Sequence, residues 1–214
     1  MTRFDRESWD ERYRDAESVW SRNPNPQLVA EASNLTPGRA LDVGCGEGTD
    51  ALWMAGQGWR VTAVDFSQPA LDRGAARAAA ASGRVAERIS WEQHDLLDRR
   101  PEHHAYDLVS SQFMHLPSDQ LPPLFARLAD SVAAGGTLLV VGHHVSDVST
   151  GLRPDLPEMF FTATEVAQQL GYGWSIDVAE ERARSTPGPD GDDMVVHDTV
   201  LRATRESTPT ASVD

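Results

Sequence analysis

Short apolar runs recur along the first two thirds of the chain and alternate with longer amphipathic stretches. Parallel strands that are covered on both faces are nearly continuously apolar, so these runs indicate buried strands. Strand and helix signals that alternate in this way predict an α/β fold with a Rossmann-like, doubly wound, mostly parallel sheet. The predicted strands are residues 40–43, 60–65, 89–93, 106–111 and 137–142, and the predicted helices are residues 49–57, 69–82 and 118–134.

The pattern changes after residue 142. Residues 143–160 contain two prolines and a glycine and predict a loop. Residues 162–170 predict a helix, because Thr162 and Glu165 have the spacing of a capping box.

Two further apolar segments, residues 174–181 and 197–205, complete a seven-stranded sheet whose last strand most simply runs antiparallel to the others. The connection 182–196 is rich in Gly, Pro and Asp. Its length and composition predict a mobile flap over the rim of the sheet. The final residues, 207–214, are expected to be a disordered tail.

Residues 1–34 predict an N-terminal helical cap that is broken at residues 23–26, Asn-Pro-Asn-Pro. The cap carries Trp9, Tyr13 and Trp20 as well as arginines. The cap could simply pack on the core. Alternatively, it could form a lid over a bound substrate, with an arginine that recruits an anion. At roughly 150 residues per domain, a chain of 214 residues favours a single domain over residues 1–206.

The charge of the chain argues against two classes of partner. It carries 19 basic and 33 acidic residues, a formal net charge of −14. Nucleic acids and anionic membranes are bound through clustered Lys and Arg, which this sequence lacks. The polar N-terminus is no signal peptide, and the apolar runs are too short to span a bilayer, so a cytoplasmic protein is expected. Cys45 is the only cysteine and cannot form an internal disulfide.

The most informative local feature is a glycine-rich turn after the first strand. Gly44, Gly46 and Gly48 alternate with other residues, whereas the dinucleotide fingerprint is G-x-G-x-x-G. Asp65 ends the second strand, where a carboxylate can accept hydrogen bonds from both ribose hydroxyls. Glu47 inside the turn would repel a pyrophosphate, which favours a nucleoside cofactor without phosphate over NAD.

Five segments together resemble the successive motifs of class I S-adenosylmethionine (SAM)-dependent methyltransferases. They are LDVGCGEGTDALWMA, VTAVDFS, QHDLLD, YDLVSSQFMHL and GGTLLVV, within about residues 35–142. The flanks are similar to small bacterial methyltransferases of the tellurite-resistance and thiopurine-methyltransferase-like type. The resemblance implies SAM as cofactor and S-adenosylhomocysteine (SAH) as product.

The family pattern also implies which residues bind the cofactor. Asp42 would reach the methionine amine, Asp65 the ribose and Asp95 the adenine, although Asp65 and Asp95 could instead cap loops. Cys45 is interpreted as a small residue that fits a tight turn. The implied cofactor contacts are Asp42, Gly44, Cys45, Gly46, Gly48, Asp65, Phe66, Ser67, Asp95, Leu96, Ser111, Gln112 and Trp20.

Methyl transfer needs a base only when the acceptor is protonated, and histidine is the natural candidate. Because ligands bind at the carboxyl ends of parallel strands, His115, His143, His144 and His197 are expected at one rim. His115 and His143 are the predicted catalytic residues, although each could instead be structural. A metal site that also uses Asp147 is conceivable, but adjacent histidines are poor joint ligands, and no metal is expected.

The sequence therefore predicts a SAM-dependent methyltransferase that acts on a small-molecule acceptor, as a monomer or a homodimer. It does not choose among sulfur, oxygen, nitrogen, halide and metalloid acceptors. Two alternatives remain open. One is a non-catalytic SAM-binding or interaction module, and the other is an NAD-dependent enzyme on the same fold.

Overall fold

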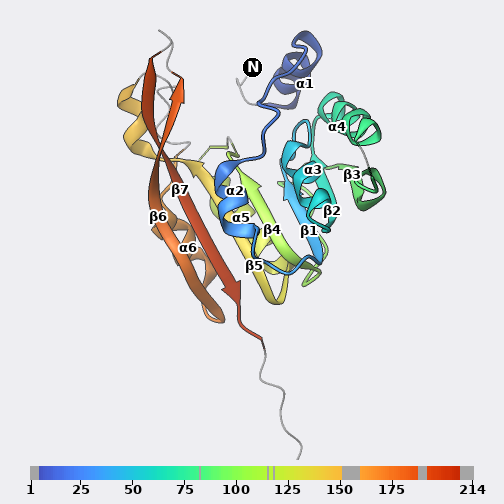
Figure 1. The fold of residues 1–214 in the computed structure, drawn as a ribbon. Helices are drawn as coiled ribbons and strands as arrows, with labels where there is room; N and C mark the ends of the chain where they lie inside the picture. The colour runs from blue at the N-terminus through green and yellow to red at the C-terminus, as the bar shows by residue number, and fades with distance from the viewer. Residues whose placement is uncertain are drawn as a thin grey trace, which may run out of the picture.

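The computed structural model describes residues 5–81, 83–114, 116–117, 119–150, 160–187 and 192–207. In these residues, seven strands form one sheet in the order β3-β2-β1-β4-β5-β7-β6 (Figure 1). The strands are β1 (Arg39–Val43), β2 (Arg60–Asp65), β3 (Ile89–Gln93), β4 (Tyr106–Gln112), β5 (Val132–His143), β6 (Trp174–Pro187) and β7 (Asp193–Arg205). The predicted Rossmann-like, seven-stranded sheet is confirmed.

The last strand of the chain lies inside the sheet and not at its edge. Strands β1 to β5 are parallel, and β7 pairs antiparallel with β5 on one side and with β6 on the other. The predicted antiparallel direction of the last strand is therefore confirmed, and β6 forms the edge. The classic dinucleotide-binding sheet has the order 3-2-1-4-5-6, so the inserted β7 distinguishes this sheet from it.

Helices cover both faces of the sheet, and each face has its own apolar core. Leu28, Met54 and Ala78 pack with one face, from α2, α3 and α4. Leu124 and Val166 pack with the other, from α5 and α6. The helices are α1 (Arg6–Asp15), α2 (Pro26–Ala32), α3 (Thr49–Gly56), α4 (Gln68–Ala80), α5 (Leu121–Ser131) and α6 (Ala163–Leu170), with short 3-10 turns at Ala86–Arg88 and Val145–Thr150.

Local sequence signals place several helix ends. Thr162 and Glu165 form the predicted capping box at the start of α6. Pro26 occupies the first turn of α2, and the side chain of Asn25 accepts a hydrogen bond from the Gln27 N–H. The helical N-terminal segment is interrupted over residues 16–25, so the break includes most of the Asn-Pro-Asn-Pro sequence but begins seven residues before it. Its first part, α1, packs against α4, and α2 packs against β5 (Figure 1).

The predicted flap at 182–196 is wrong over most of its length. Strand β6 continues to Pro187 and β7 begins at Asp193, and the two remain in antiparallel register up to their ends. Each strand satisfies the backbone groups of the other beyond the rim of the sheet, which a composition rich in Pro and Asp does not reveal. We call these paired ends, residues 182–187 and 193–196, the hairpin arm. Residues 188–191 lie outside the described residues.

Two further expectations concern the ends of the chain. Most of the predicted tail, residues 208–214, lies outside the described residues, and the single domain over 1–206 stays a prediction. In the described part of the chain, no helix is long and apolar enough to cross a membrane.

Candidate active site

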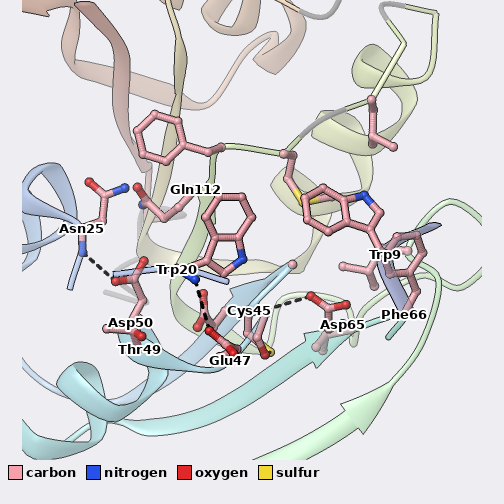
Figure 2. A pocket seen from close by; sticks show the side chains of 18 of the residues that line it. Trp9, Trp20, Asn25, Cys45, Glu47, Thr49, Asp50, Asp65, Phe66 and Gln112 are labelled. Atoms are coloured by element: carbon pink, nitrogen blue, oxygen red, sulfur yellow. Dashed lines mark hydrogen bonds between the residues drawn. The ribbon is translucent and has the colours of Figure 1, made fainter. Parts of the chain in front are cut away.

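A large cavity opens at the carboxyl ends of the parallel strands (Figure 2). Its volume is about 1670 Å³. Three parts of the chain enclose it: the glycine turn, the N-terminal segment and the hairpin arm. A single ligand usually occupies roughly 300–1,000 Å³, so this cavity has room for two ligands side by side.

The glycine turn has a shape that other residues would not tolerate. Gly46 has φ +51°, and a Cβ there would lie 2.8 Å from the Tyr13 hydroxyl oxygen. Gly48 has φ +72°, and a Cβ there would overlap the Trp91 indole, which packs beneath the turn. The Gly46 N–H donates to Asp65 Oδ2 at 2.9 Å. The turn therefore brings its backbone close to the cavity, and Asp65 fixes it.

Three carboxyl groups form an acidic floor, which we define as Asp42, Asp50 and Asp65. Asp42 and Asp65 are buried, and Asp50 is half-buried. Burial raises the pKa of Asp42 well above its ordinary value, and the charges of Asp50 and Asp65 raise it further. Burial also raises the pKa of Asp65, and that of Asp50 to about 6. Asp42 Oδ2 is buried and has no hydrogen-bond partner among the described residues. An orphaned acceptor among three carboxylates suits a ligand with a cationic donor.

Glu47 fastens the N-terminal segment to the glycine turn. Its side chain is only 3% exposed. One carboxylate oxygen accepts from Arg73 at 2.9 Å, and the other accepts from the N–H groups of Val19 and Trp20 at 3.2 and 3.3 Å. These donors compensate the charge of Glu47, so the expectation that it would repel a pyrophosphate is not supported. Its position makes it a tether for the segment above the cavity.

The tether places Trp20 over the cavity. Trp20 Nε1 donates to the Tyr13 hydroxyl at 2.8 Å, and desolvation by burial raises the pKa of that hydroxyl. The indole nevertheless remains 45% exposed. In Figure 2 it lies between the Asn25–Asp50 pair and the group formed by Asp65, Phe66 and Trp9. The N-terminal segment thus has the position of a lid, as one of the two interpretations of the sequence expected.

Another part of the cavity wall, which we call the distal end, consists of Gln112, Phe113, His143 and Arg184. The rings of Phe113 and His143 lie 4.4 Å apart, and the Arg184 guanidinium lies 5.9 Å from the centre of the Phe113 ring. Phe113 has φ +52°, a strained conformation for a residue with a side chain. Strain held directly after β4, on the wall of a cavity, is typical of a functional position.

Only part of the predicted histidine rim enters the cavity. His143 lines it, whereas His144 and His197 do not. Instead, His197 Nδ1 lies 3.1 Å from Asp147 Oδ1, and His144 Nδ1 lies 3.4 Å from Glu181 Oε1. His115 lies outside the described residues, so its placement stays a prediction. Within the described ranges, no group of three or more His, Cys, Asp or Glu side chains is arranged to hold a metal ion.

Most of the predicted cofactor residues line the cavity, and three do not. Gly48 packs against Trp91, Ser67 is fully buried with its N–H bound to Asp65, and Ser111 is buried inside β4. These three do not line the cavity, and their contact with the cofactor stays a prediction. The predicted residues that do line it are Asp42, Gly44, Cys45, Gly46, Asp65, Phe66, Asp95, Leu96, Gln112 and Trp20.

The sequence analysis missed three residues of the site. Asp50 lies in the first turn of α3. An acidic residue at that position is usually explained by its favourable interaction with the helix dipole and not by a role in a site. Glu47 was given an electrostatic role and not a tethering one. Arg184 lies in the segment that was interpreted as a flap, so only the pairing of β6 with β7 could have placed it at the cavity.

Comparison with known proteins agrees with this geometry. Residues 40–136 match the family model described as a methyltransferase domain. An uncharacterised methyltransferase of Mycobacterium tuberculosis is 35% identical over 113 residues, which are 52% of this chain and 54% of that protein. Thiocyanate methyltransferase 1 of Brassica oleracea is 25% identical over 169 residues, 77% of this chain and 73% of that protein. The chain spans about half the length of the mycobacterial relatives that it matches.

Solved structures support the same fold. The N-methyltransferase NodS of Bradyrhizobium japonicum, in complex with SAH, superposes with a TM-score of 0.69 at 18% identity, covering 94% of this chain and 97% of that one. The sheet and the cavity at its carboxyl edge thus have the Rossmann-like fold of that structure. The match of residues 40–136, which contain the glycine turn and strands β1 to β4, to a methyltransferase domain agrees with the resemblance to class I SAM-dependent methyltransferases.

The described residues fit SAM, the cofactor of this family. SAM carries an ammonium, a sulfonium and one carboxylate. For its cationic groups, the acidic floor offers the unpartnered Asp42 Oδ2 among three carboxyl groups. Each oxygen of Asp65 accepts one backbone N–H, and a carboxylate has about four acceptor positions, so two remain for hydroxyl donors. Met114 fills the space beside Gly44, so the turn admits no larger side chain there.

The raised carboxyl pKa values predict that cofactor affinity depends on pH. A cation favours the ionised carboxylates, so binding releases protons and affinity rises with pH through about 6, the value for Asp50. In the absence of SAM, the stability of the fold depends on pH in the opposite direction. A carboxyl group whose pKa is raised in the folded state stabilises the protein at low pH, and this stability is lost as the pH rises from about 4 to about 6. Calorimetric titration with SAM between pH 5 and 8, in two buffers of different ionisation enthalpy, measures both affinity and proton release.

The matched variant for this prediction is Asp50→Asn, which keeps the oxygen that accepts from the Asn25 N–H at 2.7 Å. Its titration should lose most of the rise near pH 6. An affinity that is constant over this range in the unmodified protein would contradict the role of the acidic floor.

Proposed function

We propose that this protein transfers the methyl group of SAM to a small-molecule acceptor and releases SAH. The observation that carries the proposal is the lining of one large cavity, which combines an acidic floor beside the glycine turn with the residues of the distal end. The floor suits a cationic nucleoside cofactor, and the remaining volume suits a second small ligand next to it.

On this proposal, named residues hold the cofactor. Asp42 binds the ammonium of SAM, and Asp65 binds its ribose hydroxyls. Gly44 and Gly46 let the backbone of the turn approach the cofactor closely. Phe66, Asp95 and Leu96 line the part of the cavity beyond Asp65, where the adenine would lie. Bound SAM supplies a carbon that its sulfonium makes electrophilic.

The chain itself orients the acceptor and excludes water. The tethered lid with Trp20 covers one side, and the hairpin arm covers another. Alignment of two bound reactants in a water-poor cavity can supply several kcal/mol of a displacement barrier. We assign His143 the role of orienting the acceptor or accepting its proton, because its ring stands on the Phe113 ring at the distal end.

A small acceptor fits the enclosure and the comparisons better than a macromolecular one. The lid and the arm both line the cavity, so both segments border the space for the acceptor. The net charge of −14 disfavours nucleic acid. A relative that is similar over 77% of this chain is named for a small acceptor, thiocyanate.

The test is formation of SAH from SAM with a panel of small acceptors: a thiol, iodide, tellurite, a phenol and an amine. The proposal expects turnover with at least one chemical class and a lower turnover number in His143→Ala with little change in SAH affinity. The panel also includes extracts of small metabolites. If SAH binds but no acceptor in the panel or in the extracts is methylated, the result would favour the alternative of a non-catalytic SAM-binding module.

A further inference from the structure

Arg184 lines the cavity, and one nitrogen of its guanidinium is already hydrogen-bonded within the protein. Its Nε donates to Asp198 Oδ2 at 2.7 Å, and Asp198 is fully buried. The same carboxylate oxygen accepts from Gln27 Nε2 at 3.2 Å, which connects the hairpin arm to α2. A buried carboxylate that is itself held in place fixes the direction of an arginine side chain.

The outer edge of this guanidinium is available. Across the residues that the structure describes, neither Nη1 nor Nη2 of Arg184 has a hydrogen-bond or ion-pair partner, although the side chain is only 26% exposed. The neighbouring Arg182 shows the contrast: it pairs with Glu31 and Glu180 and does not line the cavity. An arginine with a fixed Nε and two open Nη groups presents the edge that binds a carboxylate in a bidentate manner.

The surroundings of Arg184 make this edge a binding position. The face of the Phe113 ring lies 5.9 Å from the guanidinium carbon, and the His143 ring packs on that same ring. The acidic floor lines the same cavity, beside the glycine turn. The protein as a whole carries a charge of −14 and repels anions, so an open arginine inside its cavity is a specific feature.

We propose that Arg184 binds the carboxylate of the methyl acceptor, and that the substrate class is therefore small carboxylate-bearing molecules. Asp198 is the positioning residue that aims Arg184. This inference rests on the proposed function, since it names the second ligand of the same cavity. A cationic cofactor over the acidic floor and an anionic acceptor at Arg184 would attract each other across the cavity.

The test uses pairs of acceptors that differ only in the anion: glycine and glycinamide, 3-mercaptopropionate and 3-mercaptopropionamide, 4-hydroxybenzoate and 4-hydroxybenzamide. SAH formation gives kcat/KM for each member with the full-length protein. We expect the carboxylate of the active pair to be preferred at least tenfold. In Arg184→Gln this preference should disappear, because the charge-assisted bonds to the carboxylate are lost. The variant also removes the partner of the buried Asp198, so urea denaturation checks that it is folded.

Two variants separate recognition from structural support. Arg184→Lys keeps the positive charge but not the guanidinium edge that binds a carboxylate through two parallel hydrogen bonds. It should therefore show only part of the preference of the unmodified protein. Arg84→Gln removes an arginine that pairs with Glu87 on the surface and does not line the cavity, so it should retain the full preference. Equal rates for acid and amide, a preference that survives Arg184→Gln, or the same loss in Arg84→Gln would overturn the proposal.

If no pair is turned over, binding decides the question. Saturation-transfer NMR with benzoate and benzamide, with and without SAH, reports on the distal end directly. A benzoate preference that vanishes in Arg184→Gln supports the proposal, and equal binding of the two overturns it. SAH affinity is measured separately. Failure of SAH to bind contradicts the methyltransferase function, whereas a missing benzoate preference contradicts only the assignment of Arg184.

Discussion

Replacing Asp65 with asparagine is expected to lower the affinity for SAH at least tenfold. Both oxygens of Asp65 accept a backbone N–H, from Gly46 and from Ser67, each at 2.9 Å. An asparagine can accept only one of the two, and its amide would face the other donor. The variant therefore loses acceptor positions for the ribose and disturbs the glycine turn. Hydrogen bonds to a charged group contribute about 1.5–3 kcal/mol, which corresponds to roughly tenfold or more.

The measurement is calorimetric titration with SAH, beside chemical denaturation that monitors folding. Asp98→Asn is a suitable control, because Asp98 is exposed near the same rim, does not line the cavity, and its substitution makes the same change in net charge. Unchanged SAH affinity in Asp65→Asn would show that the cofactor position is wrong. A similar loss in Asp98→Asn would point to bulk charge and not to the site.

Replacing Glu47 with alanine should both destabilise the protein and release the N-terminal segment. The substitution leaves the Arg73 guanidinium and the N–H groups of Val19 and Trp20 without their common acceptor. Loss of one partner from a buried ion pair costs up to about 3–5 kcal/mol, and Arg73 is 27% exposed, so we expect about 2 kcal/mol of unfolding free energy. SAH affinity should fall as well, because Trp20 loses its fixed position.

Urea denaturation measures the stability, and limited proteolysis measures the release of residues 16–22. Glu87→Ala provides the control, since Glu87 pairs with Arg84 on the surface at 3.8 Å and is 72% exposed. Cleavage of the N-terminal segment that is no faster in Glu47→Ala than in Glu87→Ala would mean that Glu47 is not a tether.

Local patterns were sufficient to predict the centre of the fold. Strands β2 and β3 have the predicted bounds, and the ends of β1 and β4 differ by one residue, because buried parallel strands are apolar along their whole length. The alternation of strands with helices fixes the side of each crossover, so the cavity and the glycine turn also followed from the sequence.

Features that depend on distant pairing were not predictable in this way. The hairpin arm consists of RARSTP opposite DMVV, and its strand structure comes from the partner strand and not from its own composition. Arg184 and Glu47 acquire their roles from residues far along the chain: Arg184 from Asp198 and Gln27, and Glu47 from Arg73 and the lid. The rule that placed four histidines at one rim gives the end of a strand but not the direction of a side chain. That is why His144 and His197 point elsewhere.

The most direct test of the central claim is a calorimetric titration of the full-length protein with SAH, with NADH as the comparison. The cavity with its acidic floor predicts binding of one SAH per chain, a loss of affinity in Asp65→Asn and no measurable binding of NADH. Binding of NADH, or no binding of SAH to the folded protein, would contradict the assignment of this cavity to SAM.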